Sequence, residues 1–108
     1  MNKVNLIGRV TKNIELSTYG EEGKYAKFFI AINEYNKNKK EKLTDFIQIV
    51  AWGNNAVFLS KYVNKGDLIG IEGKLKTKTY NRDGMKKYST EIHINHCDLI
   101  KKVEKKIG

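Results

Sequence analysis

One segment, from Thr44 to Gly53, constrains the fold of this chain more than any other. It reads TDFIQIVAWG, and its alternation predicts a β-strand, because successive side chains of a strand point to opposite faces of the sheet. The two faces carry Ile47, Ile49 and Ala51 on one side and Phe46, Gln48, Val50 and Trp52 on the other. A half-buried strand needs only one apolar face, so the two aromatic rings of the second face indicate a surface with a role beyond the core.

Alternation of the same kind predicts four further strands. We expect them at residues 4–16, 25–33, 67–80 and 85–99, with a turn at 19–24, a mobile basic loop at 34–42 and a hairpin turn at 81–84. Gly8 is expected to allow a bulge or a sharp bend in the first strand.

A single helix is predicted between the third and fourth strands. Asn54 or Asn55 would cap its start, and Lys65 followed by Gly66 would end it. The stripe expected to face the core comprises Val57, Phe58, Tyr62 and Val63, with Leu59 at its edge. Three strands, one helix and a two-strand hairpin predict an all-β fold, a five-stranded Greek-key barrel of the OB type. Another small barrel is the alternative. We expect one domain over residues 1–100 and a short basic C-terminal end over residues 101–108.

The chain is strongly basic. It holds 21 Lys and Arg residues against 12 acidic ones, a formal net charge of +9 in 108 residues, and this excess favours a polyanionic partner. A basic but merely solvated surface is the alternative. One side of the predicted fourth strand, opposite its apolar residues, carries Lys74, Lys76, Lys78 and Tyr80. The hairpin and the preceding loop add Arg82, Lys86, Lys87 and the lysines of residues 37–42.

Aromatic rings set among lysines are suited to stack unpaired bases and to hold their phosphates, which favours the binding of single-stranded nucleic acid. The candidate stacking rings are Tyr35, Phe46, Trp52 and Tyr80. Phe46 and Trp52 could instead be buried against a loop, the helix or a second subunit. Burial of all four rings, however, requires more interior than a domain of this size offers.

The chain resembles the bacterial single-stranded DNA-binding protein family over roughly residues 1–100. The resemblance rests on four segments in the family's order and spacing, MNKVNLIGRVTKNIEL, TDFIQIVAWG, YVNKGDLIGIEGKLKTKTY and RDGMKKYSTEI. It implies an OB fold, assembly as a homo-oligomer, usually a tetramer, and the wrapping of single-stranded DNA without sequence preference. It also implies no catalysis, and a role in DNA replication, recombination and repair.

The resemblance assigns roles to individual residues. Phe46 and Tyr80 stand at the family's main base-stacking positions, and Trp52 at the aromatic before the glycine that ends the same strand. Tyr35 lies near the aromatic that follows the second strand. The positions at or near phosphate contacts are Lys3, Lys65, Lys74, Lys76 and Lys78. Two positions depart from the family, because Gln48 and Asn54 stand where basic residues are frequent.

Members of that family usually continue into a linker and an acidic tip that recruits replication and repair proteins, whereas this sequence ends on a basic segment, residues 105–108. We therefore expect no such recruitment by these residues. Two alternatives to a single-stranded DNA-binding module stay open. One is an OB-fold replication-restart (primosomal) adaptor that binds DNA and proteins, and the other is an RNA-binding accessory domain.

Other chemistries lack candidates in the sequence. Strand periodicity places His93 and Cys97 on one side and His96 on the other, with no fourth ligand, so we expect no metal site. No Ser-His-Asp group, carboxylate pair or phosphate-binding glycine loop is visible, so we expect neither an enzyme nor a cofactor. Without a signal-peptide pattern or an apolar run of membrane length, the sequence predicts a cytoplasmic, nucleoid-associated protein.

Overall fold

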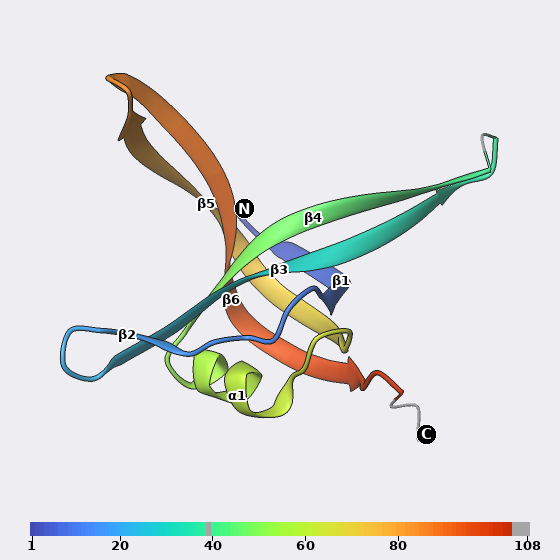
Figure 1. Cartoon of the computed structure of the whole chain (residues 1–108), viewed down its shortest axis with the longest axis horizontal. Coiled ribbons are helices and arrows are strands. Elements are labelled where there is room, and N and C mark those ends of the chain that lie inside the picture. The colour runs from blue at the N-terminus through green and yellow to red at the C-terminus, as the bar shows by residue number, and fades with distance from the viewer. Residues whose placement is uncertain (39, 105–108) are drawn as a thin grey trace.

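The computed structural model describes residues 1–38 and 40–104, and over these residues six strands and one helix follow one another along the chain (Figure 1). In order, they are β1 (Val4–Val10), β2 (Ser17–Tyr19), β3 (Gly23–Asn36), β4 (Glu41–Trp52), α1 (Asn54–Tyr62), β5 (Leu68–Arg82) and β6 (Met85–Lys101). No helix in the described ranges is long and apolar enough to cross a membrane.

The five longer strands form a ring. The order of pairing is β1, β5, β6, β4 and β3, and β3 returns to β1 through the pairs Arg9↔Ala31 and Val10↔Ile30. Only β4 and β6 run parallel, joined at Ile49↔Ile92 and Val50↔His93, while the other pairs are antiparallel. The predicted all-β, five-stranded OB-type fold with one helix after the third long strand is therefore confirmed. The structure adds the short edge strand β2.

The core fills the ring and is closed at one end by the helix. Its fully buried side chains include Val10, Ile30, Ile49, Leu59 and Ile69. The β3–β4 and β5–β6 hairpins extend beyond this core as two arms that point in different directions (Figure 1). The arms matter for function because side chains on them stay in solvent on both sides of the ribbon.

The first strand is shorter than predicted. It ends at Val10, whose backbone bonds to the turn before β5. The Val10 N–H donates to Asp67 O at 3.0 Å, and the Gly66 N–H donates to Val10 O at 2.8 Å. Ile14 continues the apolar alternation because it packs into the core, 6% exposed, without lying in a strand. Gly8 is no bulge, since the β1–β5 register runs through it; a Cβ there would lie 3.0 Å from Ala31 O, so glycine allows β1 to approach β3.

Other boundaries shift as well. The residue before the helix is Gly53, with φ 59, and no side chain caps the first turn; Asn55 instead donates to Asn95 O at 3.2 Å. The buried helix residues are Ala56 and Leu59, while Tyr62 is 57% exposed, so both the predicted cap and the predicted stripe are wrong in detail. The helix ends at Tyr62.

Both hairpins are longer than expected. Strands β3 and β4 continue through Asn36↔Glu41, which reduces the predicted loop at 34–42 to a short turn. The turn between β5 and β6 is confirmed, and its two central residues, Asp83 and Gly84, have φ 53 and 78, as a tight hairpin requires. Strand β6 reaches Lys101, and residues 105–108 of the predicted basic end lie outside the described residues.

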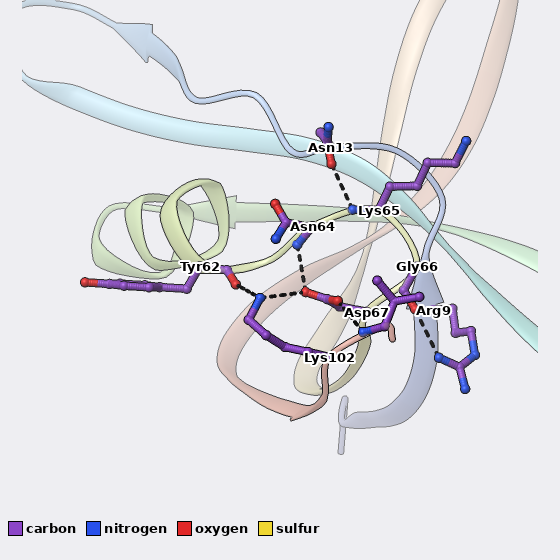
Figure 2. A network of polar contacts seen from close by, with 9 residues as sticks. Arg9, Asn13, Tyr62, Asn64, Lys65, Gly66, Asp67 and Lys102 are labelled. Carbon is purple, nitrogen blue, oxygen red and sulfur yellow. Dashed lines mark hydrogen bonds and ion pairs between the residues drawn. The ribbon is translucent and has the colours of Figure 1, made fainter. Parts of the chain in front are cut away.

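A buried carboxylate fixes the chain where β6 ends. Asp67 is 1% exposed and accepts hydrogen bonds from Asn64 N and Val103 N, both at 2.8 Å, and from Lys102 Nζ at 3.2 Å (Figure 2). Burial raises the pKa of Asp67, but these N–H donors and the Lys102 ammonium outweigh it, so this pKa lies below its ordinary value of 3.8. The same turn is held by Arg9, whose Nη1 donates to Gly66 O at 3.0 Å.

Candidate nucleic-acid interface

Strand register places the predicted aromatic and basic residues on a single face. Directly paired residues of neighbouring strands project to the same side, so the pairs Ala31↔Phe46, Val50↔His93 and Lys74↔His93 join four strands. We call this side of β3, β4, β6 and β5 the outer face. The opposite side of β4 carries Ile47 and the buried Ile49 and Ala51. The outer face therefore runs from one hairpin arm, across the ring, to the other arm, with Val50 and Glu91 buried where it crosses the ring.

All four predicted stacking rings lie on the outer face and are exposed. Their exposed fractions are 60% for Tyr35, 64% for Phe46, 40% for Trp52 and 44% for Tyr80. Tyr35 is on the β3–β4 arm and Tyr80 on the β5–β6 arm, with the two β4 rings between them. Burial of these rings within the chain, which the sequence left open, does not occur.

The predicted basic residues separate into two groups. Those on the outer face of the β5–β6 arm are exposed, and they are Lys74, Lys76, Lys78, Arg82 and Lys87. Alternate residues of a strand lie ~6–7 Å apart, so the three lysines of β5 form a regular row beside the rings.

Three predicted cations lie elsewhere. Lys86 is opposite Asn81 on the reverse side of the arm, with its Nζ 5.8 Å from the centre of the Tyr88 ring. Lys3 precedes β1 and pairs with Glu72 at 3.3 Å. Lys65 lies in the turn after the helix, and its side chain points away from the Asp67 network (Figure 2). Strand alternation turns the Lys86 side chain to the reverse side of the arm, and its contact with phosphate stays a prediction.

Strand β3 contributes residues that the sequence analysis missed. Phe29, 46% exposed, is opposite Gln48, and the exposed Lys27 is opposite Val50. Tyr25 pairs with Trp52, and their ring centres lie 5.6 Å apart. The signal was present, because residues 25–33 are apolar on nearly both sides of the strand, as in β4.

Two hydrogen bonds in series connect the Trp52 ring to side chains of the neighbouring strand β6. Trp52 Nε1–H donates to His93 Nδ1 at 3.3 Å, and His93 Nε2 lies 2.9 Å from Glu91 Oε1. Glu91 is only 7% exposed, although it belongs to a cationic surface. His93 and Cys97 lie on opposite sides of β6, contrary to the periodicity, because the β5–β6 register shifts between Glu72 and Gly73.

The described residues contain no group of three or more His, Cys, Asp and Glu side chains that could hold a metal ion. Cys97 packs into the core, and burial, with Asp98 nearby, raises the pKa of its thiol above the ordinary 9.0. A thiol of this kind is unreactive. The arrangement can offer ring faces and ammonium groups to an extended polyanion.

A second surface lies on β1, β5 and β6. Ile7 on β1 and Ile100 on β6 are 59% and 49% exposed, and they border a shallow cavity of about 540 Å³ that Gly70 also lines. Exposed branched apolar residues around a hollow are typical of contacts between protein chains.

Comparison with known proteins supports a specific family. The model of the single-strand binding protein family matches residues 1–100. A protein of Clostridium acetobutylicum named single-stranded DNA-binding protein 3 is 43% identical over 94 residues, which is 85% of this chain and 65% of that protein. A Streptococcus pyogenes protein named single-stranded DNA-binding protein 1 is 38% identical over 104 residues, 94% of this chain and 80% of that protein. The chain thus spans about two thirds of the clostridial protein's length.

A solved structure has the same fold. It is described as the Plasmodium falciparum SSB complex with ssDNA, and it superposes with a TM-score of 0.80 and 33% sequence identity over 94% of both chains.

Proposed function

Because the chain belongs to the single-strand binding protein family, we propose that it binds single-stranded DNA without sequence preference, and that it acts as a binding protein and not as an enzyme. The observation that carries this proposal is the outer face, on which four exposed rings and a lysine row lie side by side. Bases stack on aromatic faces whatever their identity, and ammonium groups hold the phosphates between them.

The residues divide into two roles. Tyr35, Phe46, Trp52 and Tyr80 offer stacking platforms, joined by Phe29. Lys74, Lys76, Lys78, Arg82 and Lys87 are placed for phosphate contact on the same face, and Lys27 adds a further charge beside Trp52. Lys3, beside Glu72, and Lys65, in the turn after the helix, stay proposed phosphate contacts apart from this row, and Lys86 is assigned no contact with a strand on the outer face.

Titration with oligonucleotides tests the proposal. The chain should bind oligo-dT more tightly than a duplex of equal length, because paired bases cannot stack on protein rings. Equal affinity for the two would overturn it. Oligo-rU is the third arm of the same experiment, and tighter binding of RNA than of DNA would favour the RNA-binding alternative.

We further propose that the chain forms a homo-oligomer, most simply a tetramer. The exposed Ile7 and Ile100 around the cavity on β1, β5 and β6 supply an apolar contact surface that includes none of the four rings and none of the lysine row. Light scattering should return a mass near four times the 12.4 kDa of one chain at micromolar concentration. A monomer mass would contradict the proposed homo-oligomer and would leave the proposed DNA binding unaffected.

Sequence-independent binding suits a protein that covers single strands exposed during DNA replication, recombination and repair. This role, in the cytoplasm at the nucleoid, follows from the proposed activity. It would be tested by following the chain in cells, where it should concentrate at sites of DNA synthesis.

A further inference from the structure

We propose that His93 is a positioning residue for the binding face: it holds the Trp52 indole in the orientation that a base meets, and it releases that indole when it takes up a proton. The part of this inference that concerns DNA rests on the proposed function. The hydrogen bond between Trp52 and His93 is a feature of the protein without DNA.

The hydrogen-bond chain fixes the protonation of His93. An indole N–H can only donate, so His93 Nδ1, 3.3 Å from Trp52 Nε1, must carry a lone pair. The proton of the neutral imidazole is then on Nε2, which donates to Glu91 Oε1 at 2.9 Å. Glu91 is nearly buried and therefore holds the ring in one orientation. Trp52, His93 and Glu91 thus form a directional chain of hydrogen bonds along the outer face, which ends at the nearly buried Glu91.

Trp52 needs such a support because of where it lies. It is the last residue of β4, followed by Gly53 with φ 59, and its side chain is 40% exposed. Tyr19 meets it edge-on at 5.3 Å and Tyr25 is tilted against it at 5.6 Å. These rings restrict the indole on one side, and among its described contacts only the bond to His93 fixes the direction of its N–H edge.

Protonation reverses this interaction. Imidazolium carries hydrogen on both nitrogens, so Nδ1–H would face the indole N–H and the bond would break, while the pairing with Glu91 would strengthen. The charged groups around His93 are Glu91 on its own strand, Lys74 and Lys76 on β5, and Lys27 on β3 opposite Val50. The nearest residues of β4 are Val50 and Trp52, which carry no charge.

Trp52 is the single tryptophan of the chain, so its emission reports on this hydrogen bond directly. Emission of the DNA-free protein, followed across a pH series, should change in one step, because protonation of His93 Nδ1 would remove the acceptor of the indole N–H. The step should disappear in His93→Asn. It should persist in His96→Asn, the matched control, since His96 pairs with Asp98 on β6 and is not a partner of Trp52.

Affinity for oligo-dT at neutral pH supplies the second readout. His93→Leu removes the acceptor, and it should bind roughly two- to tenfold more weakly, which corresponds to one hydrogen bond. His93→Asn, whose amide oxygen can accept from the indole, should bind within about twofold of the unaltered chain. Circular dichroism of each variant checks that the fold is kept.

The emission and affinity measurements each have an outcome that contradicts the proposed role of His93. Emission that does not change with pH, a step that survives in His93→Asn, or full affinity in a folded His93→Leu variant would each overturn the proposal. If the step depends on His93 but the unaltered chain does not bind oligo-dT, the proposed function fails while the assigned hydrogen bond is supported.

Discussion

The lysine row of β5 allows a quantitative test of the binding face. Lys74, Lys76 and Lys78 are exposed on one side of the strand, and among the described residues no ion pair involves them. Each phosphate that a lysine neutralises on a single strand contributes ~0.7 to the slope of log K against log salt. The variant with all three replaced by alanine should therefore show a slope smaller by about 2.

The smaller salt slope of the triple alanine variant changes its affinity relative to that of the unaltered chain. Between 50 mM and 200 mM salt, a slope difference of about 2 changes the ratio of affinities by roughly sixteenfold, so the alanine variant should bind much more weakly at low salt and approach the unaltered chain at high salt. The assay is fluorescence titration with oligo-dT at four or more salt concentrations, which uses the quenching of Trp52 or of a dye on the oligonucleotide.

A matched control separates local phosphate binding from net charge. Lys61 is exposed on the helix, off the outer face, so replacing it by alanine lowers the charge by one and leaves the lysine row of β5 intact. This control should keep the original slope. A triple variant with an unchanged slope, or a control that lowers it equally, would refute the placement of phosphates along β5.

Further predictions follow from single residues. Phe46→Ala and Tyr80→Ala should each weaken oligo-dT binding by ~1–3 kcal/mol, the cost of one stacking platform, and equal affinity in both folded variants would show that the rings are not used. Asp67→Asn should lower the free energy of unfolding by about 1–3 kcal/mol, because its amide N–H₂ would face buried donors. Since the folded pKa of Asp67 is depressed, its contribution is present above the ordinary pKa of 3.8 and is lost as the pH falls through the lower folded value. Chemical denaturation of the two forms at neutral and acidic pH should show their difference shrinking in acid. Gly73→Ala should destabilise the fold by about 1–3 kcal/mol, because its Cβ would clash with the His93 carbonyl; full stability in thermal denaturation would contradict that close approach.

Much of the architecture was predictable because local pattern and tertiary contact agree. The alternation in residues 44–53 specified a strand with two useful faces; Ile49 and Ala51 on its apolar side are buried, and so is Val50 on the aromatic side. The hairpin turn could be placed because Asp83 and Gly84 are residues that accept positive φ. The row of lysines on β5 followed from a period of two, which no irregularity interrupts between residues 74 and 82.

The errors occur where a distant segment overrides the local pattern. Ile14 reads as a continuation of the first strand, yet the chain turns at Val10 because backbone groups of residues 66 and 67 complete its hydrogen bonds. Asn55 reads as a helix cap, yet its side chain bonds the backbone of β6. His93 and Cys97 read as neighbours on one face, yet a register shift separates them. None of these partners lies within the window of residues that a periodic pattern samples.

Taken alone, the amino-acid sequence specified which side chains share a face of β4 and of the arm segment of β5, that rings and lysines lie on the same side, and that the chain belongs with proteins of this kind. These properties follow from the alternation of a single strand and from composition. Folding was needed to join the faces of four strands into one surface, to include Phe29 in it and exclude Lys86, and to place His93 and Glu91 behind Trp52. Strand pairing and register depend on interactions between residues far apart in the chain, and no local period encodes them.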